Sequence, residues 1–152
     1  MPENALTKAR APIEPVSTLA TAIAGRYTIS KTFTFAAAHH LPGLPDGHKC
    51  GRNHGHTWRV RVAINAEELT GPGWVTDFGD LAPLARFIEQ HLDHQDLNAV
   101  LPVSPTSENL AAFVAAWCQQ HLEPTVHGRL ESVTVSEGDD LSVEFRPRAV
   151  RG

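Results

Sequence analysis

Histidines are concentrated in one short part of this sequence. Five of the nine lie between His39 and His56. In His54-Gly55-His56 the two imidazoles are two positions apart, so in a strand they project from the same face. His39 ends the preceding alternating segment and can supply a third ring. Three neutral imidazoles leave one tetrahedral position of zinc free, which is typical of a catalytic site. We therefore expect His39, His54 and His56 to bind Zn²⁺.

Cys50 lies in the same segment, near Lys49 and Arg52, two cations that favour a thiolate. If three histidines complete the protein's share of an open zinc site, this thiol is free to transfer protons. As a fourth ligand it would instead close the site and make the zinc structural, and the spacing leaves both readings open. Cys118 differs, because it lies beside Trp117 in an apolar helical pattern and is expected to be inert.

Two acidic positions could take part in proton transfer or ligand binding. Asp93 directly precedes His94, and a carboxylate beside an imidazole can fix the ring's tautomer and raise its basicity. A solvated loop pair would have the same sequence. Glu137 ends a run of valines and serines, where an acid could bind a ligand or simply be exposed. The remaining histidines are expected to be ordinary loop or surface residues: His40, His48, His91, His121 and His127.

Alternating side chains predict strands on both sides of the histidine-rich segment. Residues 27–37 and 56–65 each place apolar residues at every second position, which indicates half-buried strands. Residues 41–53 between them contain prolines and glycines that are incompatible with regular structure, so they are expected to form a loop. The histidines should therefore lie where two strands meet this loop.

Helical spacing of apolar residues follows in the next part of the chain. It predicts one helix over residues 81–92, with Asp80 as its cap, and a second that begins after its cap Thr106 and ends before Pro124. Residues 130–137 and 141–145 alternate again and predict a hairpin. The order ββααββ predicts an α+β fold with an antiparallel four-stranded sheet and two helices on one face.

The bulk composition limits the possible functions. The 152 residues fit one domain, expected to span residues 25–148 and to follow a mobile extension of residues 1–24. The formal charge of −4 has no basic stripe beside it, which argues against nucleic-acid binding. No apolar run approaches the ~18 residues of a membrane span. The two cysteines lie in unlike contexts, so we expect a reducing compartment, the cytoplasm.

Five segments of the chain, in this order, resemble the 6-pyruvoyl/6-carboxytetrahydropterin synthase family. They are residues 33–39 (FTFAAAH), 50–56 (CGRNHGH), 75–78 (VTDF), 92–98 (LDHQDLN) and 105–109 (PTSEN). The resemblance covers nearly everything from Tyr27 to Phe145. It implies the T-fold, in which ββααββ subunits join their sheets into an oligomeric β-barrel, commonly as trimers paired into hexamers. Active sites would then lie between subunits.

The resemblance also assigns roles to individual positions. It implies that His39, His54 and His56 are zinc ligands, that Cys50, Asp93 and His94 are catalytic, and that Glu137, Thr106 and Glu108 bind the pterin. The sequence departs from the family pattern in three places: Gly138 stands where many members have threonine, Ala36 where an acid or serine is frequent, and the N-terminal extension is long.

The spacing of three residues between Cys50 and the His-Gly-His segment resembles that of the 6-carboxytetrahydropterin synthases in the family. The implied reaction converts 7,8-dihydroneopterin triphosphate to 6-carboxy-5,6,7,8-tetrahydropterin with release of acetaldehyde and triphosphate, in the queuosine and deazapurine route. Two alternatives are a relative with another outcome, such as pyruvoyltetrahydropterin formation or side-chain cleavage to a simpler pterin, and a non-catalytic zinc- or pterin-binding module.

Overall fold

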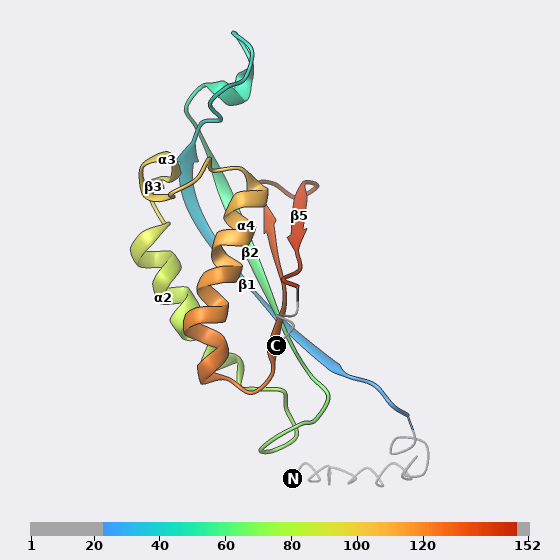
Figure 1. Cartoon of the computed structure of the whole chain (residues 1–152). Coiled ribbons are helices and arrows are strands. Elements are labelled where there is room, and N and C mark those ends of the chain that lie inside the picture. Colours follow the sequence, from blue (N-terminus) through green and yellow to red (C-terminus); the bar gives the residue numbers. More distant parts are fainter. Residues whose placement is uncertain (1–22, 149–152) are drawn as a thin grey trace, which may run out of the picture.

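The computed structural model describes residues 23–148, so most of the expected extension, residues 1–24, lies outside the described part. One curved sheet forms a layer, and helices α2 (Ala82–His91) and α4 (Ser107–Trp117) cover one of its faces (Figure 1). The strands are β1 (Tyr27–His39), β2 (His54–Ala66), β3 (Gln95–Asp96), β4 (Arg129–Ser136) and β5 (Ser142–Phe145). No helix among the described residues is long and apolar enough to cross a membrane.

Strands β1 and β2 form the longest antiparallel ladder of the sheet. Each has 13 residues, and their pairing runs from Tyr27 opposite Ala66 to His39 opposite His54. Both strands are longer than predicted, because the ladder continues through the histidines at the loop end. The alternating pattern correctly indicates the buried positions Phe33, Phe35, Trp58, Val60, Val62 and Ile64, whereas Ile29 is half-buried and Tyr27, at the start of β1, is 53% exposed.

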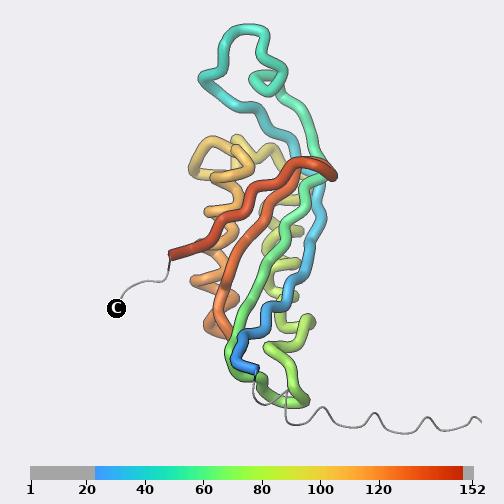
Figure 2. Tube along the Cα trace, turned by 90° about the vertical axis from the view of Figure 1, so that its right-hand side faces the viewer, coloured from blue at the N-terminus to red at the C-terminus, as the bar shows by residue number. Residues whose placement is uncertain are grey.

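The predicted four-stranded antiparallel sheet is wrong in one respect. The sheet has five strands in the order β3-β1-β2-β4-β5, and β3 runs parallel to β1 at Ala37 and Ala38. A strand of two residues carries no periodicity, so the sequence pattern did not reveal it. Figure 2 shows β5, β4, β2 and β1 side by side in front of the helices. Within the described chain the sheet is open, with β3 and β5 at its edges.

Of the two helix-cap predictions, the one for Thr106 is correct and the one for Asp80 is wrong. The Thr106 hydroxyl accepts a hydrogen bond from Asn109 N at 3.1 Å and caps α4 as expected. Asp80 does not cap α2. Asp77 instead caps the preceding 3₁₀ turn by accepting from Gly79 N at 2.7 Å, while Asp80 accepts a hydrogen bond from the Thr76 hydroxyl. The 3₁₀ turn places the Asp77 carboxylate, and not that of Asp80, at a free backbone N–H group.

Four shorter helical segments complete the described residues. They are the 3₁₀ turn Lys49–Gly51 inside the predicted loop, the helix α3 (Leu97–Val100) after β3, a π-helical turn, Cys118–Leu122, that extends α4, and the 3₁₀ turn Glu123–Thr125 that follows it. The segment between β1 and β2 projects beyond the end of the sheet (Figure 1).

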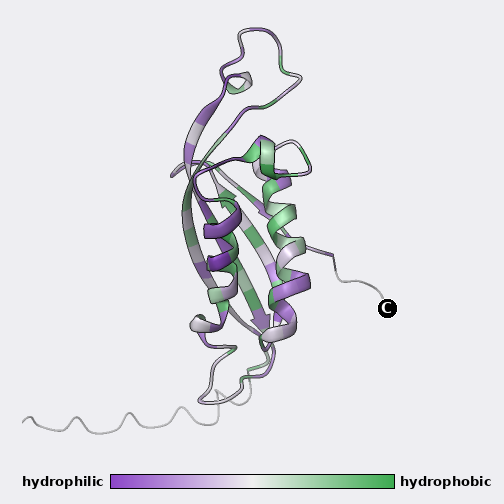
Figure 3. Cartoon of the chain, turned by 90° about the vertical axis from the view of Figure 1, so that its left-hand side faces the viewer, coloured by the Kyte–Doolittle hydropathy of each residue, from purple (hydrophilic) through white to green (hydrophobic). Residues whose placement is uncertain are grey.

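A single apolar core lies between the sheet and the helices. Its largest fully buried side chains include Trp58, Ile64, Leu84, Leu110 and Leu122. The opposite face of the sheet carries threonines and arginines at the alternate positions, and the change of hydropathy from residue to residue can be followed along the strands in Figure 3. Because the buried residues of β1 and β2 belong to the same core as those of α2 and α4, the histidines at the strand ends stand on a packed support.

Candidate metal centre and active site

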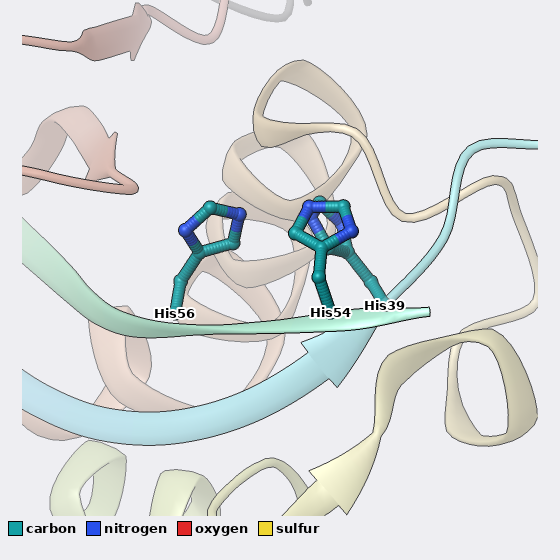
Figure 4. A group of neighbouring side chains, drawn as sticks. All are labelled: His39, His54 and His56. Atoms are coloured by element: carbon teal, nitrogen blue, oxygen red, sulfur yellow. The ribbon is translucent and has the colours of Figure 1, made fainter. Parts of the chain in front are cut away.

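Three imidazoles meet at the end of the β1–β2 ladder. His39 is paired with His54, and His56 lies two residues further along β2 on the same face. One ligand nitrogen of each ring lies within 4.8 Å of the other two. Figure 4 shows all three rings on the same side of the two strands. Strand pairing therefore brings together the three histidines that the sequence predicts as ligands.

Backbone carbonyls fix the orientation of two of these rings. His39 Nδ1 lies 2.7 Å from the Pro105 carbonyl oxygen, and His54 Nδ1 lies 2.7 Å from the Arg52 carbonyl oxygen. Since a carbonyl can only accept, each ring donates its Nδ1–H and keeps the lone pair on Nε2. This is the tautomer that metal-binding histidines adopt when a backbone oxygen holds the other nitrogen.

The nitrogens that face the centre of the group lack partners. His39 Nε2 and His56 Nε2 are buried and make no hydrogen bond within the described chain. Burial lowers the pKa of His56, Glu137 opposes this effect, and the neighbouring His39 and His54 lower the pKa further, so the ring favours the neutral form that binds metals. A buried unpaired nitrogen is unfavourable unless a ligand completes it. The donor set and its unpaired nitrogens therefore fit a divalent ion such as zinc.

The three histidines line a cavity of ≈ 620 Å³. Its other lining residues come from the β1–β2 segment and from the connection after β4, and they are Leu41, Lys49, Cys50, Arg52, Asn53, Glu137 and Leu141. Cys50 is half-buried, and its carbonyl accepts a hydrogen bond from Leu41 N at 2.8 Å. The described group of neighbouring metal-binding atoms comprises the three histidines and does not include the Cys50 sulfur. The thiol thus lies in the cavity but outside that group.

Glu137 lines the same cavity and lies close to His56. One carboxylate oxygen accepts a hydrogen bond from the Ser107 hydroxyl at 2.7 Å, and the other lies 3.8 Å from His56 Nε2. The sequence analysis missed Ser107, because no local pattern reveals a contact between residues 30 positions apart. The neighbouring Thr106 uses its hydroxyl as a helix cap, and Glu108 is exposed in the first turn of α4. Neither of these two lines the cavity.

Asp93 and His94 form a separate arrangement at the edge of β1. One Asp93 oxygen accepts the Ala36 N–H at 2.9 Å, and the other lies 2.9 Å from His94 Nδ1. The Ala36 hydrogen bond, with a further contribution from His94, lowers the pKa of Asp93 and keeps it ionised. His94 has a left-handed backbone (φ 58°), which is uncommon outside glycine, and its N–H donates to the Ala36 carbonyl.

The Asp93–His94 pair does not share a cavity with Cys50 in one chain. His94 lines an open hollow together with Ala36, Ala38 and Thr57, and the hollow is also lined by His56. In the ladder, Ala36 pairs with Thr57 while the adjacent Ala37 pairs with His56, so the first pair projects from the face opposite the histidines. The His94 side chain is 83% exposed. The structure therefore brings the three histidines, which we call the metal triad, together with Cys50 and Glu137 in one cavity, and His94 does not line that cavity.

Comparisons with known proteins agree on one family. The family model described as 6-pyruvoyl tetrahydropterin synthase matches residues 28–148. The chain is 43% identical over 107 residues to a 6-carboxy-5,6,7,8-tetrahydropterin synthase of Synechocystis sp., covering 66% of this chain and 81% of that protein. It is 31% identical over 92 residues to a dihydroneopterin monophosphate aldolase of Pyrococcus furiosus, covering 60% of this chain and 76% of the relative.

A solved structure shows the same fold. The 6-pyruvoyl tetrahydropterin synthase of Caenorhabditis elegans superposes with a TM-score of 0.70 at 24% sequence identity, covering 82% of this chain and 97% of that one.

Proposed function

The chain belongs to the 6-pyruvoyl tetrahydropterin synthase family, and on this basis we propose that it is a zinc-dependent carbon–carbon lyase. The proposed reaction converts 7,8-dihydroneopterin triphosphate and water to 6-carboxy-5,6,7,8-tetrahydropterin, acetaldehyde and triphosphate, in the queuosine and deazapurine route. The observation that carries the proposal is the group of three histidines, with two buried unpaired Nε2 atoms, beside a free cysteine in one cavity. The identity with the Synechocystis protein supports the 6-carboxy product.

His39, His54 and His56 would hold the zinc ion through their Nε2 atoms. When bound, zinc supplies positive charge that stabilises negative charge developing on the side-chain oxygens of the substrate. The backbone oxygens of Pro105 and Arg52 hold two of the rings in the required tautomer. With three protein ligands, a bound zinc ion would remain accessible to the side-chain oxygens of the substrate.

Cys50 and Glu137, which line the same cavity as the histidines, would both act on the substrate. The Cys50 thiol, outside the ligand group, would transfer a proton at a side-chain carbon of the substrate. The Glu137 carboxylate would accept hydrogen bonds from the amino group and a ring N–H of the pterin. Ser107 orients this carboxylate, because its hydroxyl already donates to one oxygen at 2.7 Å.

His94 would complete the site from a second copy of the chain. In one chain it lines a different cavity from Cys50, and its ring is exposed and held by Asp93. Both sheet edges are open, so pairing of edges between copies would close a barrel. We propose a homo-oligomer, a trimer or hexamer, with active sites between subunits. Both cysteines are free, which suits the reducing cytoplasm where we place the enzyme.

A mixing experiment tests the site and the assembly together. Cys50→Ala and His94→Gln should each be inactive alone. The two variants are then mixed in equal amounts, dissociated and reassembled. Half of the subunits carry a native Cys50 and the other half a native His94, so about a quarter of the sites should combine a native Cys50 with a neighbour's native His94, and about a quarter of wild-type turnover should return. Product is measured by mass spectrometry with dihydroneopterin triphosphate as substrate. Failure of the reassembled mixture to recover turnover would contradict active sites between subunits.

The Pyrococcus relative favours one alternative, because its name describes an aldolase acting on a monophosphate. Such an enzyme would cleave the side chain and leave a simpler pterin without a carboxylate. The same mass spectra distinguish this product from 6-carboxytetrahydropterin, and a non-catalytic binding module would give no product.

A further inference from the structure

Charged side chains divide the cavity into two unlike ends. Lys49 and Arg52 come from the segment between β1 and β2, whereas Glu137 comes from the connection between β4 and β5. Along β2 the histidines lie between these two segments, because Arg52 precedes His54, whereas Ser136, the residue before Glu137, pairs with Arg59 beyond His56. The whole chain has a formal charge of −4, yet two of the three charged residues lining this cavity are cations. The end of the cavity at Lys49 and Arg52 is therefore positively charged, although the protein as a whole carries a negative formal charge.

These two cations are available to a ligand. Within residues 23–148 neither Lys49 nor Arg52 makes an ion pair with a carboxylate. By contrast, Arg59, Arg129 and Arg146 each lie within 4.0 Å of an acid, at distances between 2.8 and 3.9 Å. Arginine and lysine side chains that lie beside a cavity without an internal partner can bind phosphate oxygens with charge-assisted hydrogen bonds.

Backbone hydrogen bonds fix the turn that carries the cations. The His48 N–H donates to the Pro45 carbonyl at 3.1 Å, and the Gly51 N–H donates to the His48 carbonyl at 3.0 Å. The Arg52 carbonyl accepts from the ring of His54, so this turn is bonded directly to one of the metal-binding histidines. The backbone positions of the two cationic residues relative to the triad are thus set before any ligand arrives, so that binding has to order only their side chains.

We propose that Lys49 and Arg52 form a polyphosphate subsite that binds the triphosphate group of the substrate. The inference rests on the proposed function and adds an orientation to it. The pterin ring lies at the Glu137 end, its N–H groups facing the carboxylate, and the phosphates lie at the cationic end. The carbon chain between them then lies across the three histidines. Two cations match a triphosphate better than a monophosphate, so the subsite selects the triphosphorylated substrate.

Equilibrium binding tests this subsite without depending on turnover. The wild-type holoenzyme and the variants K49Q, R52Q and K49Q/R52Q are titrated with dihydroneopterin triphosphate and with unphosphorylated dihydroneopterin, following pterin fluorescence, with zinc content checked in each preparation. R86Q is the matched control, because it removes one exposed charge on α2, away from the cavity. The double variant should bind the triphosphate about 10- to 100-fold more weakly, as loss of two exposed charge-assisted contacts implies.

The outcomes separate the subsite from the proposed reaction. Unchanged binding of dihydroneopterin, together with weaker binding of the triphosphate in the double variant and not in R86Q, supports the subsite. Equal weakening of both ligands, or no weakening of either, overturns it and leaves the lyase proposal standing. Binding with the expected preference but without product would overturn the reaction and keep the subsite. If the wild type binds neither pterin, both proposals are wrong.

Discussion

Asp93→Asn is the most informative single change at the edge of β1. In the wild type one oxygen of Asp93 accepts the Ala36 N–H at 2.9 Å, and the other lies 2.9 Å from His94 Nδ1. Because the carboxylate only accepts, His94 carries its proton on Nδ1 and its Nε2 is free to take a proton. Asparagine keeps one oxygen for Ala36 but presents an NH₂ group to His94.

This replacement reverses the tautomer while preserving the contact with the strand. The amide donates to Nδ1, so the ring proton moves to Nε2, and His94 can no longer act as a base in its neutral form. Loss of a positioned proton-transfer group lowers turnover by ~10²–10⁴. Zinc content should not change, because the metal triad lies on the other face of the sheet.

The assay combines turnover, measured by product mass spectrometry, with zinc content and thermal unfolding on the same preparation. Asp93→Ala is the comparison, because it also removes the acceptor for Ala36 and should unfold at a lower temperature than Asp93→Asn. A turnover of Asp93→Asn close to that of the wild type would show that Asp93 does not set the tautomer. Equal thermal destabilisation of the two variants would show that asparagine does not preserve the strand contact.

The pH dependence of stability gives a further check on Asp93. Its folded-state pKa is depressed, first by the Ala36 hydrogen bond and then by His94. The carboxylate therefore contributes stability that is present above its unfolded-state pKa and is lost as the pH falls through the lower folded-state value. Asparagine does not titrate, so the thermal stabilities of wild type and Asp93→Asn should converge in acid.

Four other experiments test separate parts of the structure. Cys50→Ala should keep wild-type zinc content and lower turnover by ~10²–10⁴, and simultaneous loss of zinc would identify the thiol as a ligand. Glu137→Gln should raise the Michaelis constant ~10-fold or more with a smaller effect on kcat, since glutamine cannot accept two hydrogen bonds from the pterin; an unchanged Michaelis constant would place the anchor elsewhere. Burial raises the pKa of Cys118 to about 12, so a thiol reagent at neutral pH should label only Cys50 in the native chain and both cysteines after unfolding. Gly128→Ala should lower the free energy of unfolding by about 2–5 kcal/mol in denaturant, because φ is +99° and the new Cβ would lie 2.6 Å from a backbone oxygen. Gly43→Ala, where φ is +81° but the space around the new Cβ is open, should lower it by only about 1–2 kcal/mol. Equal losses would refute the steric argument.

The sequence alone predicted the features that depend on neighbours along the chain. The period-two alternation of the β1 and β2 residues predicted both strands, and the same period placed His54 and His56 on one face. The cap at Thr106 was also correct, because a cap bonds to an N–H only three positions away. The strand pairing then brought His39 to the other two histidines, as the triad prediction required.

Features that depend on packing between distant segments were decided by the tertiary structure. The parallel strand β3 exists because the chain after α2 returns along β1, where Asp93 and His94 bond to Ala36, and its two residues carry no signal of their own. The contact of Ser107 with Glu137 joins α4 to the end of β4. Neither the spacing nor the residue types indicate which cavity Cys50 or His94 lines, because each lies in a turn whose direction is set by hydrogen bonds to another segment. A sequence pattern reports local periodicity, whereas the distance between two turns depends on how the strands and helices between them pack.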